Sequence, residues 1–180
     1  MGSELTGALE AAGVAFIFLA GSGLHFFYDW TGRRRWIAWF APVNESTWEH
    51  FKLAFWPGLV YALLEYGMIG GEVGNFWAGK ALGLLVMPLV IAGIFYAYKA
   101  VLGRHRLVLD ILLFLVAVAA GQGVSYRVLT AEPLGGAGEW WGVAGVVLMA
   151  AAYCLFTYHP PHLFLFSDPR MNSCGVGQGQ

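Results

Sequence analysis

Five separate stretches of this chain are long and apolar enough to cross a lipid bilayer as α-helices. The hydrocarbon core of a bilayer is about 30 Å thick and takes roughly 20 helical residues to cross. The stretches that meet this length lie at approximately 8–28, 46–69, 76–99, 106–128 and 138–158. The connectors between them are too short for a second domain. The sequence therefore predicts that residues 1–180 form a single membrane domain, an all-α bundle of about five transmembrane helices.

The charge content narrows the choice of partners. Charged residues make up 12% of the chain against 58% hydrophobic residues, and the formal net charge is -1. Binding to a nucleic-acid backbone requires clustered basic residues, so we predict no nucleic-acid partner and take the lipid bilayer as the main surrounding. The sequence contains no recognisable nucleotide-binding loop or haem motif. Organic cofactors are therefore not predicted, and the identity of any cofactor stays open, with a divalent metal ion as the candidate.

The few basic residues indicate how the chain is oriented. Residues 33–35 are three arginines that follow the first apolar stretch, and Lys99, Arg104 and Arg106 lie between the third and fourth stretches. Lys and Arg are enriched in the cytoplasmic loops of membrane proteins. With five spans, this rule predicts a multi-pass protein of the cell membrane with its amino terminus outside and its tail, residues 159–180, in the cytoplasm.

A dense polar block opens the second apolar stretch. Residues 44–50 read Asn-Glu-Ser-Thr-Trp-Glu-His, which places two carboxylates and one imidazole at the mouth of a predicted span. Ionisable groups at such depth are costly and mark functional sites by default. A structural interpretation is equally available, because Ser46 and Glu49 have the spacing of a capping box that satisfies the free amides of a helix start.

Imidazole and carboxylate side chains together are typical ligands of divalent transition metals. His25, near the end of the first stretch, or Asp110, near the start of the fourth, can complete such a site with Glu45 and His50, and Glu49 is the candidate general base if the site is catalytic. The predicted binding residues near the cytoplasmic side are His25, Tyr28, Asn44, Glu45, Glu49 and His50.

A second polar layer is expected toward the opposite side of the membrane. Glu65 lies near the end of the second stretch, and Gln122 lies near the end of the fourth. Lys80 enters the third stretch at a comparable depth. We predict that Glu65 and Gln122 form an outer binding station, with a salt bridge that anchors helix ends as the alternative.

The chain resembles a family of small, uncharacterised multi-pass membrane proteins of bacteria and archaea. The resemblance rests on His25-x-x-Tyr28, on the block Pro42-Val43-Asn44-Glu45-Ser46-x-Trp48-Glu49-His50-x-Lys52, and on the tail, where Pro160-Pro161 precedes Leu165-Phe166 and Asp168-Pro169. It covers essentially the whole chain. It implies a helical membrane fold and no particular activity.

Three classes of function fit these observations. The first is a protein that binds or transports a cation, a proton or a small solute through the His/Glu site. The second is a membrane-embedded, metal-dependent enzyme that acts at the cytoplasmic leaflet, with Glu49 as base. The third is a structural or accessory subunit in which the polar residues only join helix ends. The first class leads, and the sequence leaves open whether the protein is an enzyme.

Overall fold

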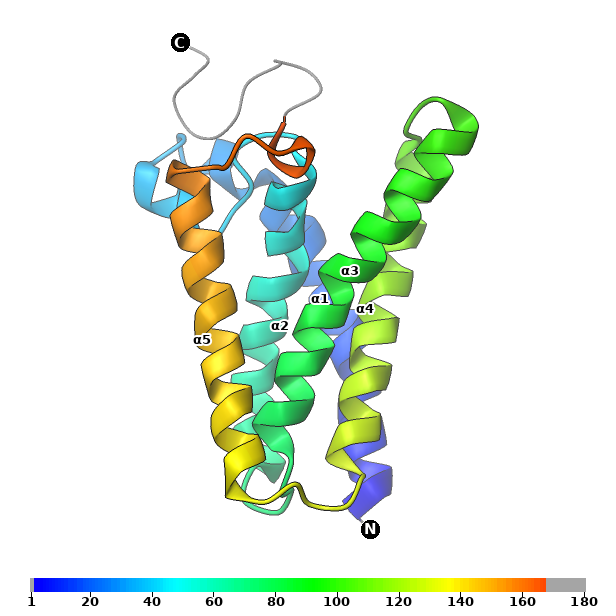
Figure 1. Ribbon diagram of the computed structural model, residues 1–180, viewed down its shortest axis with the longest axis vertical. Coiled ribbons are helices and arrows are strands. Elements are labelled where there is room, and N and C mark those ends of the chain that lie inside the picture. The colour runs from blue at the N-terminus through cyan, green and yellow to red at the C-terminus, as the bar shows by residue number, and fades with distance from the viewer. Residues whose placement is uncertain (1, 168–180) are drawn as a thin grey trace.

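The computed structural model describes residues 2–167 as a bundle of five long helices (Figure 1). The elements, in chain order, are α1 (Gly2–Trp30), the short 3₁₀ helix η1 (Arg35–Trp39), α2 (Thr47–Ile69), α3 (Phe76–Leu102), α4 (Leu107–Leu129), α5 (Gly136–Tyr158) and the 3₁₀ helix η2 (Phe164–Phe166). The described chain starts at the lower end of the bundle and finishes at the upper end. Asp168-Pro169 of the tail motif lie outside the described residues. The all-α class and the five helices are confirmed.

Four of the helices, α1, α3, α4 and α5, are long and apolar enough to cross a membrane. The exception is α2, which carries Glu49, His50, Lys52 and Glu65 within an otherwise apolar sequence. Many of its side chains, including three of these four, are buried inside the bundle. The charged residues therefore face neighbouring helices, which is where intramembrane charge is tolerated.

Small residues set the closest helix contacts. In the bundle, α3 packs against α2, α4 and α5, and α1 packs against α2 and α4. Gly83 of α3 and Gly121 of α4 meet backbone to backbone, since a Cβ atom on either would lie 2.7 Å from the carbonyl oxygen of the other. Such small-residue seams are the usual basis of helix association in lipid.

A buried proline shapes the seam between α1 and α2. Pro57 lies inside α2 and has no amide hydrogen, so the carbonyl of Leu53 one turn earlier has no helical partner. Gly21 of α1 packs directly on that carbonyl, and a Cβ atom at position 21 would lie 2.4 Å from the Leu53 oxygen. The glycine therefore allows α1 to approach the unpaired Leu53 carbonyl closely.

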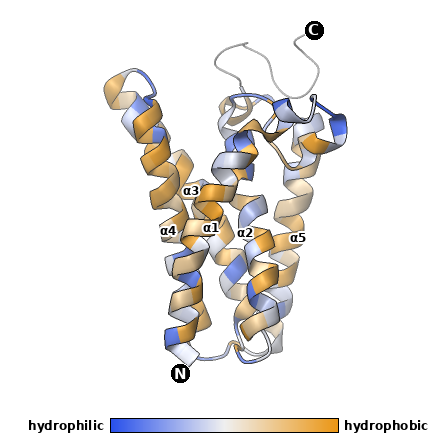
Figure 2. Cartoon of the chain, turned by 180° about the vertical axis from the view of Figure 1, so that it is seen from behind, coloured by the Kyte–Doolittle hydropathy of each residue, from blue (hydrophilic) through white to orange (hydrophobic). Residues whose placement is uncertain are grey.

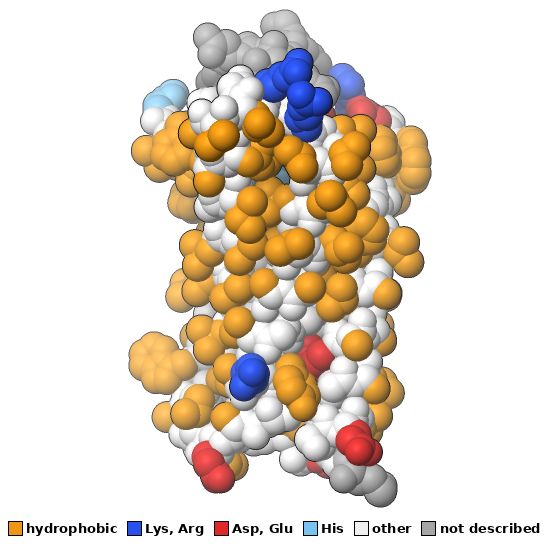
Figure 3. All heavy atoms as spheres, turned by 90° about the vertical axis from the view of Figure 1, so that its right-hand side faces the viewer, with side chains coloured by type: hydrophobic (Ala, Val, Ile, Leu, Met, Phe, Trp, Pro, Cys, Tyr) orange, Lys and Arg blue, Asp and Glu red, His pale blue; other side chains and the backbone are white. Residues whose placement is uncertain are grey.

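The outside and the middle of the bundle are both apolar. Figure 2 shows hydrophobic residues along most of the outer helices, and Figure 3 shows them across the middle of one face, with Lys and Arg side chains gathered at its upper end. Inside, Ile17, Phe55, Met87 and Val118 are at most 1% exposed and belong to one packed core. An apolar core therefore separates the polar groups at the two ends.

The start of the tail folds back across the upper end (Figure 1). The ring of Phe166 in η2 is buried and stacks 4.7 Å from the ring of Trp48 on α2, measured between centroids. His159 and His162 are exposed. This segment therefore covers the beginning of α2 with aromatic side chains.

Candidate functional site

The beginning of α2 is fixed by two side-chain caps. Ser46 has extended backbone angles, and its hydroxyl oxygen accepts a hydrogen bond of 3.4 Å from the Glu49 amide. The Asn44 side-chain oxygen accepts from the Ser46 amide at 2.9 Å. Asn and Ser are favoured at helix starts because they satisfy free amides in this way. Asn44, predicted to bind a ligand, here orders the turn that carries Glu45.

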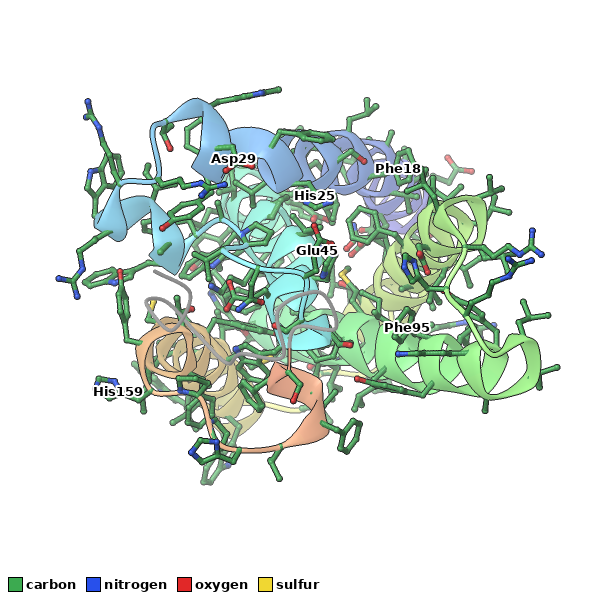
Figure 4. The ribbon with its side chains drawn as sticks, turned by 90° about the horizontal axis from the view of Figure 1, so that it is seen from above. Phe18, His25, Asp29, Glu45, Phe95 and His159 are labelled. Atoms are coloured by element: carbon green, nitrogen blue, oxygen red, sulfur yellow. The ribbon has the colours of Figure 1, made fainter. Side chains whose placement is uncertain are left out.

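Three of the predicted residues come together at this turn. His25 of α1, Glu45 of the turn and His50 of α2 each offer a ligand atom, and these atoms all lie within 4.8 Å of one another. We call these three residues the histidine group. Figure 4, a view from above, labels His25 and Glu45 next to each other, in agreement with this distance. All three are half-buried, so the group is held by the fold and still open to solvent.

The orientation of His50 suits metal binding. Its Nδ1 lies 2.9 Å from the Ser46 carbonyl oxygen, the contact in which the ring N–H donates, and its Nε2 lies 3.6 Å from Glu45 Oε2. A histidine that donates one ring N–H to a carbonyl keeps the lone pair of the other nitrogen for a metal. The ring of His25 lies edge-on to that of His50, with centroids 5.3 Å apart.

The spacing also suits a transition metal. In a tetrahedral site, two ligand atoms that each lie about 2.1 Å from the metal ion are about 3.4 Å apart. The 4.8 Å limit of the histidine group therefore requires side-chain movements of less than an ångström. Two imidazoles and one carboxylate leave further coordination positions open, an arrangement that non-haem iron and catalytic zinc sites use.

Glu49 lies in a different environment. Its Oε2 accepts from Lys52 Nζ at 2.7 Å and from the Val43 amide at 3.0 Å, and its Oε1 accepts from the Thr157 hydroxyl at 3.4 Å. Glu49 is 2% exposed and Lys52 is 0% exposed. A metal ion and the Lys52 ammonium group would compete for the same carboxylate oxygens. The ion pair therefore opposes both metal binding by Glu49 and a general-base role for it.

Lys52 makes a further contact in this buried cluster. We call Glu49, Lys52 and the groups that they hydrogen-bond the buried knot. Besides Glu49, the Lys52 ammonium group donates to the Ala38 carbonyl oxygen at 2.9 Å. The knot thus ties η1, the connection before α2 and α5 to the start of α2. The expected capping box is only half formed, because the Glu49 carboxylate binds the Val43 amide and Lys52 in place of the Ser46 amide.

The remaining predicted residues are not part of the histidine group. Tyr28 is half-buried about one turn beyond His25 on α1. Glu65 and Gln122 are buried at the other end of the bundle, in the second polar layer that the sequence predicts. Lys80 joins Glu65 to Glu10 of α1 there, and Gln122 donates to the Glu10 backbone carbonyl. Sequence reasoning missed Glu10 as a member of this layer. The available signal was a carboxylate inside the first predicted span.

Comparison with known proteins gives one match. The sequence profile described as "Family of unknown function (DUF6512)" matches residues 8–176. No curated protein and no solved structure matches the chain. The match agrees with the resemblance to an uncharacterised family and assigns no activity to any residue.

Proposed function

The chain belongs to the DUF6512 family, whose function is unknown, and we propose that it is a multi-pass membrane protein that binds a divalent transition metal ion through His25, Glu45 and His50. The observation that carries this proposal is the convergence of three ligand atoms within 4.8 Å. The ligands come from α1, from the turn and from α2, so binding would fasten two helices and their connection at one point.

The ligand chemistry favours certain metals. Two imidazole nitrogens and one carboxylate oxygen suit Zn²⁺, Fe²⁺ or Mn²⁺ better than Ca²⁺ or Mg²⁺, which prefer oxygen ligands. The Ser46 carbonyl oxygen, 2.9 Å from His50 Nδ1, supplies the outer contact that orients the ring. When bound, the ion would act as a Lewis acid toward a water or solute in its open positions.

Binding has more support than transport through the bundle. Transporters commonly carry polar groups or broken helices near the midplane. In this bundle, Ile17, Phe55, Met87 and Val118 pack the middle with apolar atoms. The proposed role is therefore that of a metal-binding membrane protein whose site opens at one side.

Elemental mass spectrometry of detergent-purified protein tests this proposal. After reloading with Zn²⁺, Fe²⁺ or Mn²⁺ in parallel, we expect near-stoichiometric metal in the wild type. His50→Ala is expected to weaken binding by more than about 100-fold, because even outer-shell contacts to metal ligands contribute 10- to 100-fold. Glu45→Gln and His25→Ala should act in the same direction.

His105→Ala is the matched control. His105 is an exposed histidine at the α3–α4 connection, 3.4 Å from a carboxylate oxygen of Asp110. We expect this variant to retain metal. Equal metal content in His105→Ala and His50→Ala, or a metal-free wild type after reloading, would refute the proposed site.

We further propose that the histidine group faces the cytoplasm. Arg33, Arg34, Arg35, Arg104 and Arg106 all lie in the connections at its end of the bundle, where the positive-inside rule places cytoplasmic loops. A fluorescent protein fused to the carboxyl terminus should fluoresce, and alkaline phosphatase fused at the same point should be inactive. The reverse pattern would place the group on the outside.

A further inference from the structure

Three charged side chains from three helices meet inside the lower end of the bundle. The ammonium group of Lys80 on α3 donates to Glu10 Oε1 of α1 at 2.6 Å and also to Glu65 Oε2 of α2. The three residues, which we call the lysine cluster, are 3%, 4% and 1% exposed for Lys80, Glu10 and Glu65. Because both carboxyl groups contact the same nitrogen, they lie side by side.

The hydrogen bonds of the cluster leave two oxygens without donors. Glu10 Oε1 accepts from Lys80 and, at 2.7 Å, from the Ser125 hydroxyl. Glu65 Oε2 accepts from Lys80. The other oxygens, Glu10 Oε2 and Glu65 Oε1, are fully buried and have no hydrogen-bond partner among the described residues. An ionised carboxylate buried with an unsatisfied oxygen is strongly unfavourable.

The charges of the cluster do not balance either. Two carboxylates and one ammonium leave one negative charge if all three groups are ionised. The ammonium group of Lys80 also lies 5.4 Å from the centre of the Phe76 ring, so its remaining side is occupied. A buried net charge costs far more than a balanced pair, and two adjacent carboxyl groups cannot easily both ionise.

The surrounding helices supply no compensating charge. On α2, the hydroxyl group of Tyr61 donates to the Leu9 carbonyl oxygen of α1. On α4, Ser125 and Gln122 are neutral, and Gln122 donates to the Glu10 backbone carbonyl at 3.3 Å. In the halves of these helices that lie toward this end, three further charged side chains occur: Glu4 of α1 and Arg127 of α4 are exposed, and Glu139 of α5 accepts from the Trp77 amide of α3.

We propose that the lysine cluster binds one exchangeable proton, held at neutral pH by the side-by-side carboxyl groups of Glu10 and Glu65. A hydronium ion of the solvent transfers the proton, which forms an O–H bond with one carboxylate oxygen and leaves a water molecule. This gives the cluster one carboxylate, one ammonium and one neutral carboxyl group. The protonated carboxyl group is neutral, and its O–H can donate a hydrogen bond. Burying a neutral carboxyl group costs much less free energy than burying a second carboxylate.

A surface groove reaches the lysine cluster from the side of the bundle. A groove of about 290 Å³ lies between α1 and α4, and Glu10, Gln122 and Tyr126 are among its lining residues. Glu10 thus belongs both to the groove and to the lysine cluster. We infer that the proton exchanges through this groove, which reaches Glu10, because the apolar core closes the direction toward the histidine group.

A proton fits this cluster better than a metal ion. Hard cations take several oxygen ligands, whereas the carboxyl groups of the cluster offer two oxygens that do not already accept a hydrogen bond. The Lys80 ammonium also lies between the carboxyl groups and repels a second cation. Replacing choline by Na⁺ distinguishes a bound proton from a bound sodium ion.

Infrared spectroscopy of the full-length protein in lipid nanodiscs provides the test. We expect the wild type at neutral pH to show the C=O stretch of about one protonated carboxyl group per chain, shifted in D₂O. Glu10→Gln and Glu65→Gln should each abolish this band. In either variant the single remaining carboxylate forms a balanced pair with Lys80 and ionises. Glu72→Gln, which changes an exposed carboxylate at the same end, should keep the band.

Three results would overturn the proposal. One is the absence of the band in the wild type at neutral pH. Another is its survival in Glu10→Gln and Glu65→Gln when both variants melt cooperatively. The third is its loss when NaCl replaces choline chloride at constant ionic strength, which would assign the site to Na⁺. If one of the two variants fails to fold, the other gives the same readout.

Discussion

Replacement of Lys52 by methionine is expected to lower the free energy of unfolding by about 3–5 kcal/mol, the range for removing one partner of a buried ion pair. Lys52 is 0% exposed and donates to Glu49 and to the Ala38 carbonyl oxygen. Methionine has a similar length and no charge, so it would leave the Glu49 carboxylate buried without its cation. The loss is measurable by denaturant or thermal unfolding in detergent.

The double variant Glu49→Gln/Lys52→Met isolates the ion pair. Removing both charges should be less damaging than the sum of the two single variants, with a coupling of about 1–3 kcal/mol. Lys99→Met is the matched control, because Lys99 lies half-exposed over the Phe95 ring. A Lys52→Met variant as stable as Lys99→Met would show that the knot does not stabilise the fold.

The second large effect is expected at Gly142, where α5 meets α3. A Cβ atom at this position would lie 2.2 Å from the carbonyl carbon of Trp77 and 2.3 Å from the amide nitrogen of Ala78. Both are backbone atoms and cannot move without shifting the helix. Gly142→Ala should therefore force α5 away from α3 and cost about 3 kcal/mol, at the upper end of the range for overpacked cores.

Gly145→Ala is the corresponding control on the same helix. A Cβ atom at position 145 would lie 3.5 Å from the Cβ of Ala81, which is an ordinary contact. We expect this variant to unfold at the wild-type temperature or slightly above, since alanine is the better helix former. Equal melting temperatures for the two variants would contradict the close α3–α5 contact.

Much of the fold follows from the sequence alone. Apolar length predicts the five helices, and Ser46 marks the start of α2 to the residue. The first helix is longer than the predicted stretch 8–28, because α1 begins at Gly2 and ends at Trp30. Hydropathy could not detect this, since Glu4 and Asp29 interrupt the apolar pattern without interrupting the helix.

The candidate sites were also predictable from the sequence only in part. His25, Glu45 and His50 lie near span ends on one side, so topology could place them in one region. The structure brings these three together, whereas Asp110, the alternative third member, lies beside Tyr98 and His105. The partners of Glu49 and Glu10 depend on which helix faces turn toward each other. Lys52 is buried with its ammonium group on the Ala38 carbonyl of η1, a contact that no local sequence pattern indicates.

The apolar core between the two polar ends also acts as an electrical insulator. Ile17, Phe55, Met87 and Val118 exclude water and ions from the middle of the bundle. In an energised membrane the voltage falls mainly across such a layer, at about 2.3 kcal/mol per elementary charge per 100 mV. The electrical potential at the histidine group and at the lysine cluster would therefore be close to that of the solution on the same side of the membrane. The occupancy of each would therefore follow the solution on its own side.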